Sequence, residues 1–290
     1  MIIDSHCHAW SEWPYEPPVP DPETRGVASQ LLNEMDLNGV DQAVVVCAQI
    51  AKNPANNAYV AGQVARYPDR LYQLVDLDSE WSTTYHTGGA AQRLRQMANQ
   101  WPVCGFTHYL RNGDDAGWLT SEDGLELLRT AAELNLIVSL SSNPEHQPAI
   151  RRAAAAFPSV PFLIHHMGYV RLGRGSLEEN VRQVLDSARV PNIYIKLSGF
   201  AYTSAVEWDY PYQDIQWVVR AEYEHFGPQR MCWGSDYPVV RFYMTYRQAL
   251  EAFRSHCGFI PAADQEQILG GTLKKLLRRE SEAGSLPGTG

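Results

Sequence analysis

Short runs of apolar and β-branched residues alternate along this chain with segments in which apolar residues recur every three or four positions. The runs are typical of buried β-strands, and the segments are typical of amphipathic helices. The pattern predicts eight strands, at residues 1–10, 42–50, 71–78, 103–110, 136–142, 162–168, 193–199 and 231–239.

Helices are expected between and after these strands, at residues 29–39, 56–68, 90–102, 123–135, 147–158, 177–191, 214–228, 246–255 and 263–279. Several of them end on Pro, Gly or Asn just before the next strand, as helix stop signals do. Strands that alternate with helices pair in parallel through right-handed crossovers. Eight such units predict a (β/α)8 TIM barrel, with an open doubly wound sheet as the alternative.

Two segments stand apart from the alternation. Residues 9–25 form a long loop, rich in proline and aromatic residues, directly after the first strand, where a barrel would place it over its active-site face. The segment at 263–279 adds a C-terminal helix beyond the eighth unit. We expect one barrel domain over residues 1–280 and a flexible tail over residues 281–290.

Composition and net charge limit the kinds of molecule that we expect the protein to bind. The chain has 290 residues and a formal net charge of −9, which argues against a nucleic-acid surface. It shows no signal-peptide pattern and no apolar stretch near the ~20 residues of a membrane span. Five cysteines without CxxC spacing indicate buried thiols in a reducing compartment. We expect a cytoplasmic protein that acts on a small molecule, without nucleic-acid or membrane partners, and with a homodimer left open.

Polar residues at the ends of three predicted strands carry the candidate chemistry. His6 and His8 lie two positions apart, so they share one face of the first strand. His165 and His166 are neighbours on the sixth strand, and strand alternation predicts that only one of them faces the barrel mouth. Asp236 ends the eighth strand. Three histidines and this aspartate would form a mononuclear site suited to Zn²⁺, with Mn²⁺ as the alternative ion.

Two further polar residues occur inside predicted strands. Lys196 interrupts the apolar run "IYIKLSG", where a lysine is costly unless it is paired or faces a cavity. It is either a buried partner of a carboxylate, or a substrate anchor or support at the Asp236 end. His108, like His165, is a candidate proton shuttle or electrophilic donor, with a structural histidine as the alternative.

The motifs "IIDSHCHAW", "FLIHHMG", "IYIKLSG" and "CWGSDYPV", in this order, resemble the amidohydrolase-2 branch of the metal-dependent amidohydrolase superfamily. "VCGFTHYLRNGDDAGWL" and "PEHQPAIRRAAAAFPSVPFLIHHMG" further resemble its lactonase-like hydrolases more than its decarboxylases. The resemblance implies a distorted TIM barrel and one divalent metal ion held by His6, His8, His166 and Asp236.

The chain departs from the family pattern at three places. His165 replaces a common aspartate on the sixth strand, and Thr107 stands where lactonase-like members usually have arginine before His108. The lysine that binuclear members carry on the fourth strand is absent from "CGFTHYL", which favours one metal over two. The first two changes affect substrate recognition, so the substrate does not follow from the resemblance.

The resulting hypothesis is a metal-dependent hydrolase of a lactone, or of a related small cyclic or aromatic organic acid, that uses metal-activated water. Asp236 would take the proton from water and pass it to the leaving group, with His166, His165 and His108 as further catalytic candidates. A non-oxidative decarboxylase with the same ligands and a non-catalytic ligand-binding barrel are the alternatives. The candidate substrate-binding residues lie at strand ends or in the following loops: Lys196, Trp10, Tyr109, Arg111, Tyr169, Arg171, Tyr202 and Tyr237.

Overall fold

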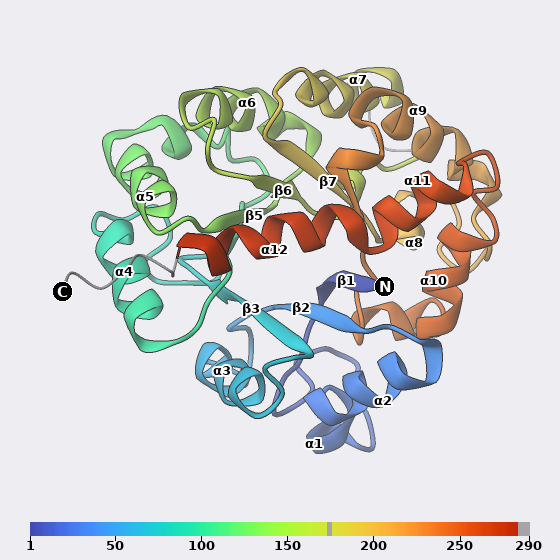
Figure 1. Cartoon of the computed structure of the whole chain (residues 1–290), viewed down its shortest axis with the longest axis horizontal. Coiled ribbons are helices and arrows are strands. Elements are labelled where there is room, and N and C mark those ends of the chain that lie inside the picture. Colours follow the sequence, from blue (N-terminus) through green and yellow to red (C-terminus); the bar gives the residue numbers. More distant parts are fainter. Residues whose placement is uncertain (173–175, 284–290) are drawn as a thin grey trace.

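The computed structural model describes residues 1–172 and 176–283, and it contains the predicted barrel of parallel strands (Figure 1). The sheet order is β1-β2-β3-β4-β5-β6-β7-β8, and each strand pairs in parallel with the next. The strands are β1 Ile3–Cys7, β2 Gln42–Val46, β3 Leu71–Asp76, β4 Gly105–Tyr109, β5 Ile137–Ser141, β6 Phe162–Ile164, β7 Ile193–Leu197 and β8 Met231–Trp233.

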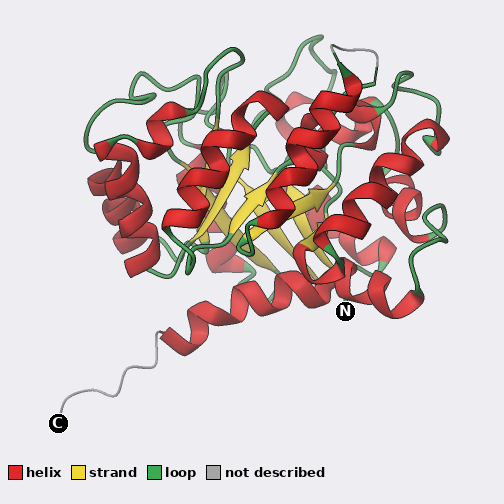
Figure 2. Ribbon diagram, turned by 90° about the horizontal axis from the view of Figure 1, so that it is seen from above, coloured by secondary structure: helices red, strands yellow, loops and turns green. Residues whose placement is uncertain are grey.

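Helices surround the strands on the outside of the barrel, as the alternating pattern predicts (Figure 2). The longer ones are α2 Ala28–Asn38, α3 Asn56–Arg66, α4 Ala90–Gln100, α5 Glu122–Glu133, α6 Gln147–Ala156, α7 Leu177–Asp186, α9 Gln216–Phe226 and α10 Tyr246–Arg254. The short helices α1 Pro22–Arg25 and α8 Phe200–Thr203 lie in loops. Apolar side chains between this layer and the strands form the larger of two buried clusters.

The C-terminal segment covers the N-terminal opening of the barrel. The single helix expected at 263–279 is divided into α11 Ala262–Glu266, a π-helical turn Gln267–Gly271 and α12 Thr272–Ala283. Gly270 in this turn lies against Met1, where a Cβ would come within 2.5 Å of the Met1 carbonyl oxygen. α12 lies across this opening (Figures 1 and 2). Its residues Leu273, Leu276 and Leu277 belong to the inner apolar cluster of the barrel. Residues 281–283 of the expected tail belong to α12, and residues 284–290 lie outside the described residues.

The barrel closes where the chain after β8 meets β1. Cys7 and Tyr237 form an isolated parallel bridge, with the His8 amide donating to the Tyr237 carbonyl at 2.6 Å. The Asp236 amide donates to the His6 carbonyl at 2.7 Å. We call this contact the closing seam. The β1 register shifts between Asp4 and Cys7, and such an irregularity re-aims side chains. Both His6 and His8 therefore face the barrel mouth, although Ile3 belongs to the inner cluster.

The buried carboxylate of Asp4 connects the two sides of the closing seam. Asp4 Oδ1 accepts hydrogen bonds from the backbone amides of His6 and Ser235, while Oδ2 accepts from the hydroxyls of Ser235 and Tyr246. Burial raises the pKa of Asp4 to about 6, and these four donors oppose that rise. One side chain thus connects β1, the segment after β8 and α10.

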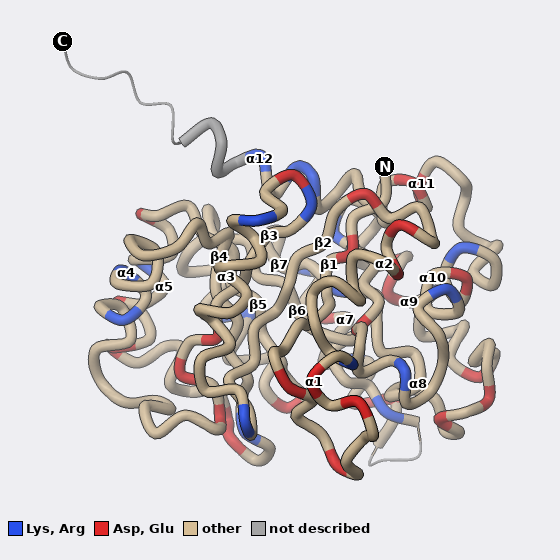
Figure 3. Tube along the Cα trace, turned by 90° about the horizontal axis from the view of Figure 1, so that it is seen from below, with Lys and Arg blue, Asp and Glu red and all other residues tan. Residues whose placement is uncertain are grey.

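The outer surface carries mixed charge. Figure 3 shows acidic and basic positions interspersed over the helices around the barrel. In the part of the chain that the structure describes, no helix is both long and apolar enough to cross a membrane.

We expect Asp4→Asn to lower the free energy of unfolding by about 1–3 kcal/mol, because the new amide group would face donors and leave one of them unpaired. Chemical denaturation measures this change. Asp41→Asn is the matched control, since Asp41 is exposed and accepts one bond, from the Ile2 amide. Equal stability of Asp4→Asn and the parent protein would contradict this account of the seam.

Candidate active site

Three imidazoles and one carboxylate converge at the C-terminal mouth of the barrel, all of them buried. The Nε2 atoms of His6, His8 and His166 lie 3.5, 3.4 and 3.9 Å from Asp236 Oδ1. His6 lies on β1 and His8 directly follows it, while His166 follows β6 and Asp236 follows β8. The four side chains predicted to form a metal site are therefore brought together.

The prediction that only one of His165 and His166 faces the site is wrong. Both rings contact His6, each with its centroid 4.4 Å from the His6 centroid. The reason is that β6 ends at Ile164, before either histidine, so strand alternation no longer applies. Residues 166–169 all have positive φ, and this left-handed turn brings the second imidazole back to the cluster.

Hydrogen-bond partners at Nδ1 fix the orientation of two of the imidazoles. His8 Nδ1 lies 2.7 Å from the Val46 carbonyl oxygen, which can only accept, so His8 carries its proton on Nδ1. His166 Nδ1 lies 2.9 Å from Ser198 Oγ. In His8, Nε2 is then free to present a lone pair to the centre of the cluster, and His166 does the same when Ser198 Oγ accepts from its Nδ1.

The third imidazole is supported by a buried lysine. Lys196 Nζ lies 3.2 Å from His6 Nδ1 and donates to Ser139 Oγ at 2.8 Å, and Ser139 Oγ lies 2.7 Å from His165 Nε2. Burial lowers the pKa of Lys196 to about 7. If His6 Nε2 binds an ion, the ring proton is on Nδ1 and Lys196 must accept it as a neutral amine. The lowered pKa makes this neutral form accessible near neutral pH.

Burial favours the neutral forms of His6, His165 and His166. It lowers the pKa of His166 to about 4, and it lowers the pKa values of His6 and His165 well below the usual range, with the nearby Lys196 as a further cause. Burial alone would raise the pKa of Asp236, but His166, His8 and the Tyr202 hydroxyl together bring it below its ordinary value. The cluster thus combines imidazole lone pairs with one anionic oxygen.

These atoms fit a divalent metal ion. Ligands at about 2.0–2.1 Å from a tetrahedral ion lie roughly 3.4 Å from one another. The distances from His6 Nε2 and His8 Nε2 to Asp236 Oδ1 are close to this value, and the distance from His166 Nε2 is longer, at 3.9 Å. His6 Nε2 is buried and has no hydrogen-bond partner, so a ligand role would remove an otherwise unsatisfied atom. His6, His8 and Asp236 form one group whose ligand atoms are close enough to hold an ion. His6, His165 and His166 form a second such group, and the two groups share His6.

A pocket of about 380 Å³ lies beside the cluster. Tyr109 and Tyr169 join the two, because their rings contact His165 and His166 at centroid distances of 5.4 and 5.0 Å. The polar lining residues include one carboxylate and one guanidinium among the described residues. The lining is Tyr15, Ala48, Ile50, Glu80, Trp81, Tyr109, Leu110, Asn112, Ser141, Ser142, Asn143, Tyr169 and Arg171.

Of the residues expected to contact substrate, Tyr109, Tyr169 and Arg171 line this pocket. Tyr202 lies at the cluster itself, where its hydroxyl donates to Asp236 Oδ2. Trp10 stacks on His8 with centroids 4.9 Å apart and donates to the Ala48 carbonyl, so it packs behind a cluster residue.

Three other expected residues lie elsewhere. Lys196 is on the inner face of β7, beneath the cluster, and its partners are His6 and Ser139 instead of a carboxylate or the pocket. Arg111 donates to the Glu80 carbonyl and lies over the Tyr85 ring. Tyr237 is buried in the closing seam against Tyr246.

His108 lies on the opposite face of β4 from the cluster. Tyr109 faces inward to His165, so its neighbour His108 points outward, where it meets His86 from the loop after β3. Sequence reasoning missed Glu80, Trp81, Asn112 and Asn143, which line the pocket. Their signal was their position, since each follows the C-terminal end of a strand, where barrel active sites lie.

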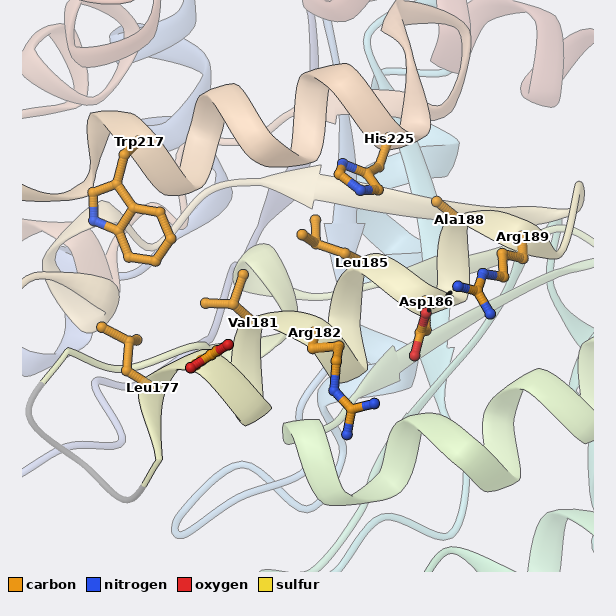
Figure 4. A pocket seen from close by; sticks show the side chains of 10 residues that line it. Leu177, Val181, Arg182, Leu185, Asp186, Ala188, Arg189, Trp217 and His225 are labelled. Atoms are coloured by element: carbon orange, nitrogen blue, oxygen red, sulfur yellow. Dashed lines mark ion pairs between the residues drawn. The ribbon is translucent and has the colours of Figure 1, made fainter.

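A second hollow, of about 900 Å³, lies on the outside of the barrel between α7 and α9 (Figure 4). Leu185 and Trp217 contribute apolar surface, and Arg189 pairs with Asp186 at its edge. None of the cluster residues lines it, so the chemistry belongs to the mouth of the barrel.

Comparisons with known proteins agree with this geometry. The family model described as amidohydrolase matches residues 3–279. An L-fucono-1,5-lactonase from Burkholderia ambifaria is 27% identical over 255 residues, which is 82% of this chain and 81% of that protein.

Solved structures share the fold. A probable 2-pyrone-4,6-dicarboxylic acid hydrolase from Acinetobacter baumannii, with citric acid bound, is 23% identical with a TM-score of 0.76, covering 96% of this chain and 99% of that one. An amidohydrolase from Burkholderia multivorans with bound zinc is 18% identical with a TM-score of 0.74 at the same coverage. At these identities the likeness concerns the fold alone.

We expect Lys196→Met to weaken metal binding about 10–100-fold, because the His6 ring would lose the partner of its Nδ1. Competition with a chromogenic chelator measures the affinity. Lys275→Met is the control, since Lys275 is exposed and bonds only to Gln229. An affinity unchanged in Lys196→Met would show that Lys196 does not support a ligand.

Proposed function

The chain belongs to the amidohydrolase family, and from that premise we propose that it is a metal-dependent lactonase that opens a small, uncharged, hydroxylated cyclic ester. One observation carries the proposal. Three imidazole Nε2 atoms and one carboxylate oxygen converge beside a pocket of about 380 Å³ at the mouth of the barrel.

His6, His8, His166 and Asp236 would hold one ion, with Zn²⁺ favoured by the nitrogen-rich ligand set and Mn²⁺ as the alternative. A divalent ion in this place lowers the pKa of water and polarises an ester carbonyl. The same four residues are the ones that the family pattern selects, and their supporting partners, Val46, Ser198 and Lys196, leave each imidazole oriented toward the centre.

Asp236 would move the proton. Its Oδ1 faces the three imidazoles, and its Oδ2 accepts the hydrogen bond of Tyr202. A carboxylate with a lowered pKa is ionised at neutral pH, so it accepts the proton released when water adds to the lactone carbonyl. Returning that proton to the ring oxygen completes the opening. Tyr202 holds the carboxylate in this orientation.

The pocket favours a neutral, hydroxylated ring. Glu80 and Arg171 are the charged side chains among its described lining residues, and their charges balance. The amides of Asn112 and Asn143 and the hydroxyls of Ser141 and Ser142 can each donate and accept, as sugar hydroxyls require. Trp81 and Tyr109 offer aromatic surface to the ring. A dicarboxylate would find one cation and a repelling carboxylate in the same space.

We expect Asp236→Asn to lower kcat on a sugar lactone by about 10²–10⁴-fold, because the amide cannot accept the proton. Lactone opening followed by a pH indicator measures the rate, and elemental analysis of the parent should give about one equivalent of zinc or manganese. His225→Ala is the control, since His225 lies on α9 outside the site. Full activity in Asp236→Asn would remove this residue from the reaction.

The substrate class is tested by competition between ring types. We expect kcat/KM for five- and six-membered sugar lactones to exceed that for a pyrone dicarboxylate by at least about 10²-fold, since the second carboxylate would be buried without a cationic partner. The reverse preference would contradict the neutral-substrate assignment. Release of carbon dioxide from an aromatic acid, without lactone opening, would replace the hydrolase by the decarboxylase alternative.

A further inference from the structure

The loop between β3 and α4, residues 77–89, forms one wall of the substrate pocket through Glu80 and Trp81. The Trp81 indole donates to Asp76 Oδ2 at 2.8 Å and its ring contacts Tyr109, with centroids 4.6 Å apart. The Glu80 amide donates to the Tyr109 carbonyl at 3.0 Å. The N-terminal part of the loop is thus attached to β3 and β4. The position of this pocket wall therefore also depends on the contacts at the far, C-terminal end of the loop.

Two sets of contacts hold the far end. Arg93 on α4 donates to the Thr87 and Gly88 carbonyls and pairs with Asp78. A histidine pair lies beside them. His86 Nε2 lies 3.3 Å from His108 Nε2. His108 Nδ1 lies 2.9 Å from the Leu77 carbonyl oxygen, which can only accept, so His108 carries its proton on Nδ1 and Nε2 is an acceptor. Where His86 carries a proton on Nε2, it therefore donates to His108. Burial lowers the pKa of His108 to about 4, which keeps it in the neutral, accepting form.

Aromatic and ionic contacts surround this bond. The His86 ring stacks between Tyr85 and Trp118, with centroid distances of 3.7 and 4.6 Å, and its Nδ1 lies 3.3 Å from Asp114 Oδ2. The Tyr85 hydroxyl also donates to Asp114, at 2.8 Å. Two adjacent loop residues therefore share one carboxylate from the segment after β4.

The contacts continue from the histidine pair to the pocket wall. The Arg111 guanidinium lies over the Tyr85 ring, 4.7 Å from its centroid, and donates to the Glu80 carbonyl at 3.2 Å. The Arg111 amide donates to the Tyr85 hydroxyl at 3.0 Å. Tyr85, His86, His108 and Arg111 form what we call the loop clasp, which runs from the outer face of β4 to the backbone of Glu80.

We propose that the loop clasp sets the position of Glu80 and Trp81, and that His86 is a positioning residue for substrate recognition. The proposal rests on the proposed lactonase function for its kinetic consequence, but the clasp itself is a property of the free protein. This positioning role explains why His86 and His108, which lie outside the candidate metal site, face each other. His86 touches no pocket atom, so it acts on substrate only through the wall that it holds.

The test compares His86→Ala with His86→Gln. His86 has φ +53°, so both variants carry the same backbone strain, and only Gln keeps a donor near the Nε2 position. We expect His86→Ala to raise KM for a sugar lactone about tenfold, with kcat changed less than about threefold, since the unpaired His108 nitrogen favours a displaced loop. His86→Gln should restore most of the affinity, and His225→Ala should match the parent.

Amide hydrogen exchange of residues 78–89 without substrate separates the two hypotheses. We expect about tenfold faster exchange over the loop in His86→Ala and near-parent exchange in His86→Gln. If the parent opens no lactone, the proposed function fails while the exchange data still test the clasp. Unchanged KM in an active His86→Ala enzyme, unchanged exchange, or equal impairment of the Ala and Gln variants would overturn the clasp.

Discussion

The site depends on the closing seam of the barrel. His6 lies on β1, His8 directly follows it, and Asp236 lies after β8. The pairing of these two segments places the ligand atoms 3.4–3.5 Å apart. The seam leaves no room for larger side chains, because a Cβ on Gly234 would lie 2.8 Å from His6 Cβ. Asp4 fixes both sides of it through four hydrogen bonds from three residues. The contact that closes the fold is therefore also the contact that assembles the candidate metal centre.

The inner layer of the barrel carries a set of buried polar groups that contact one another. His6, Lys196, Ser139 and His165 form a continuous series of contacts of 2.7–3.2 Å. Charging any of these basic groups without a partner would be costly at this depth, and the lowered pKa values of His6, His165 and Lys196 express that cost. A neutral interior around one anionic oxygen is an environment in which a divalent cation is stabilised.

The sequence predicts much of this arrangement because strands have a simple period. Eight apolar runs predict the barrel, and the spacing of His6 and His8 places both on one face. The prediction fails where the backbone leaves the strand, as it does at His166, whose φ of +47° no sequence period reveals. His108, a catalytic candidate from the sequence, lies away from the cluster for another reason. Tyr109 and not His108 occupies the inward position on β4, and an isolated histidine gives no signal of its face. The pocket lining comes from loops, whose conformations depend on contacts between distant segments.

The strand ends therefore position the residues for the chemistry, and the loops position the residues that select the substrate. The ligand atoms are attached to strand ends and to the closing seam, so they move little when loops change. Glu80, Trp81, Asn112 and Asn143 sit on segments whose positions depend on side-chain contacts such as those of Arg111 and Asp76. The four family motifs contain the cluster residues, whereas Glu80, Trp81, Asn112 and Asn143 of the pocket lie outside them. In the proposed function, charge balance in the loops selects the ring. One carboxylate against one guanidinium among the described lining residues favours hydroxyls over a second carboxylate.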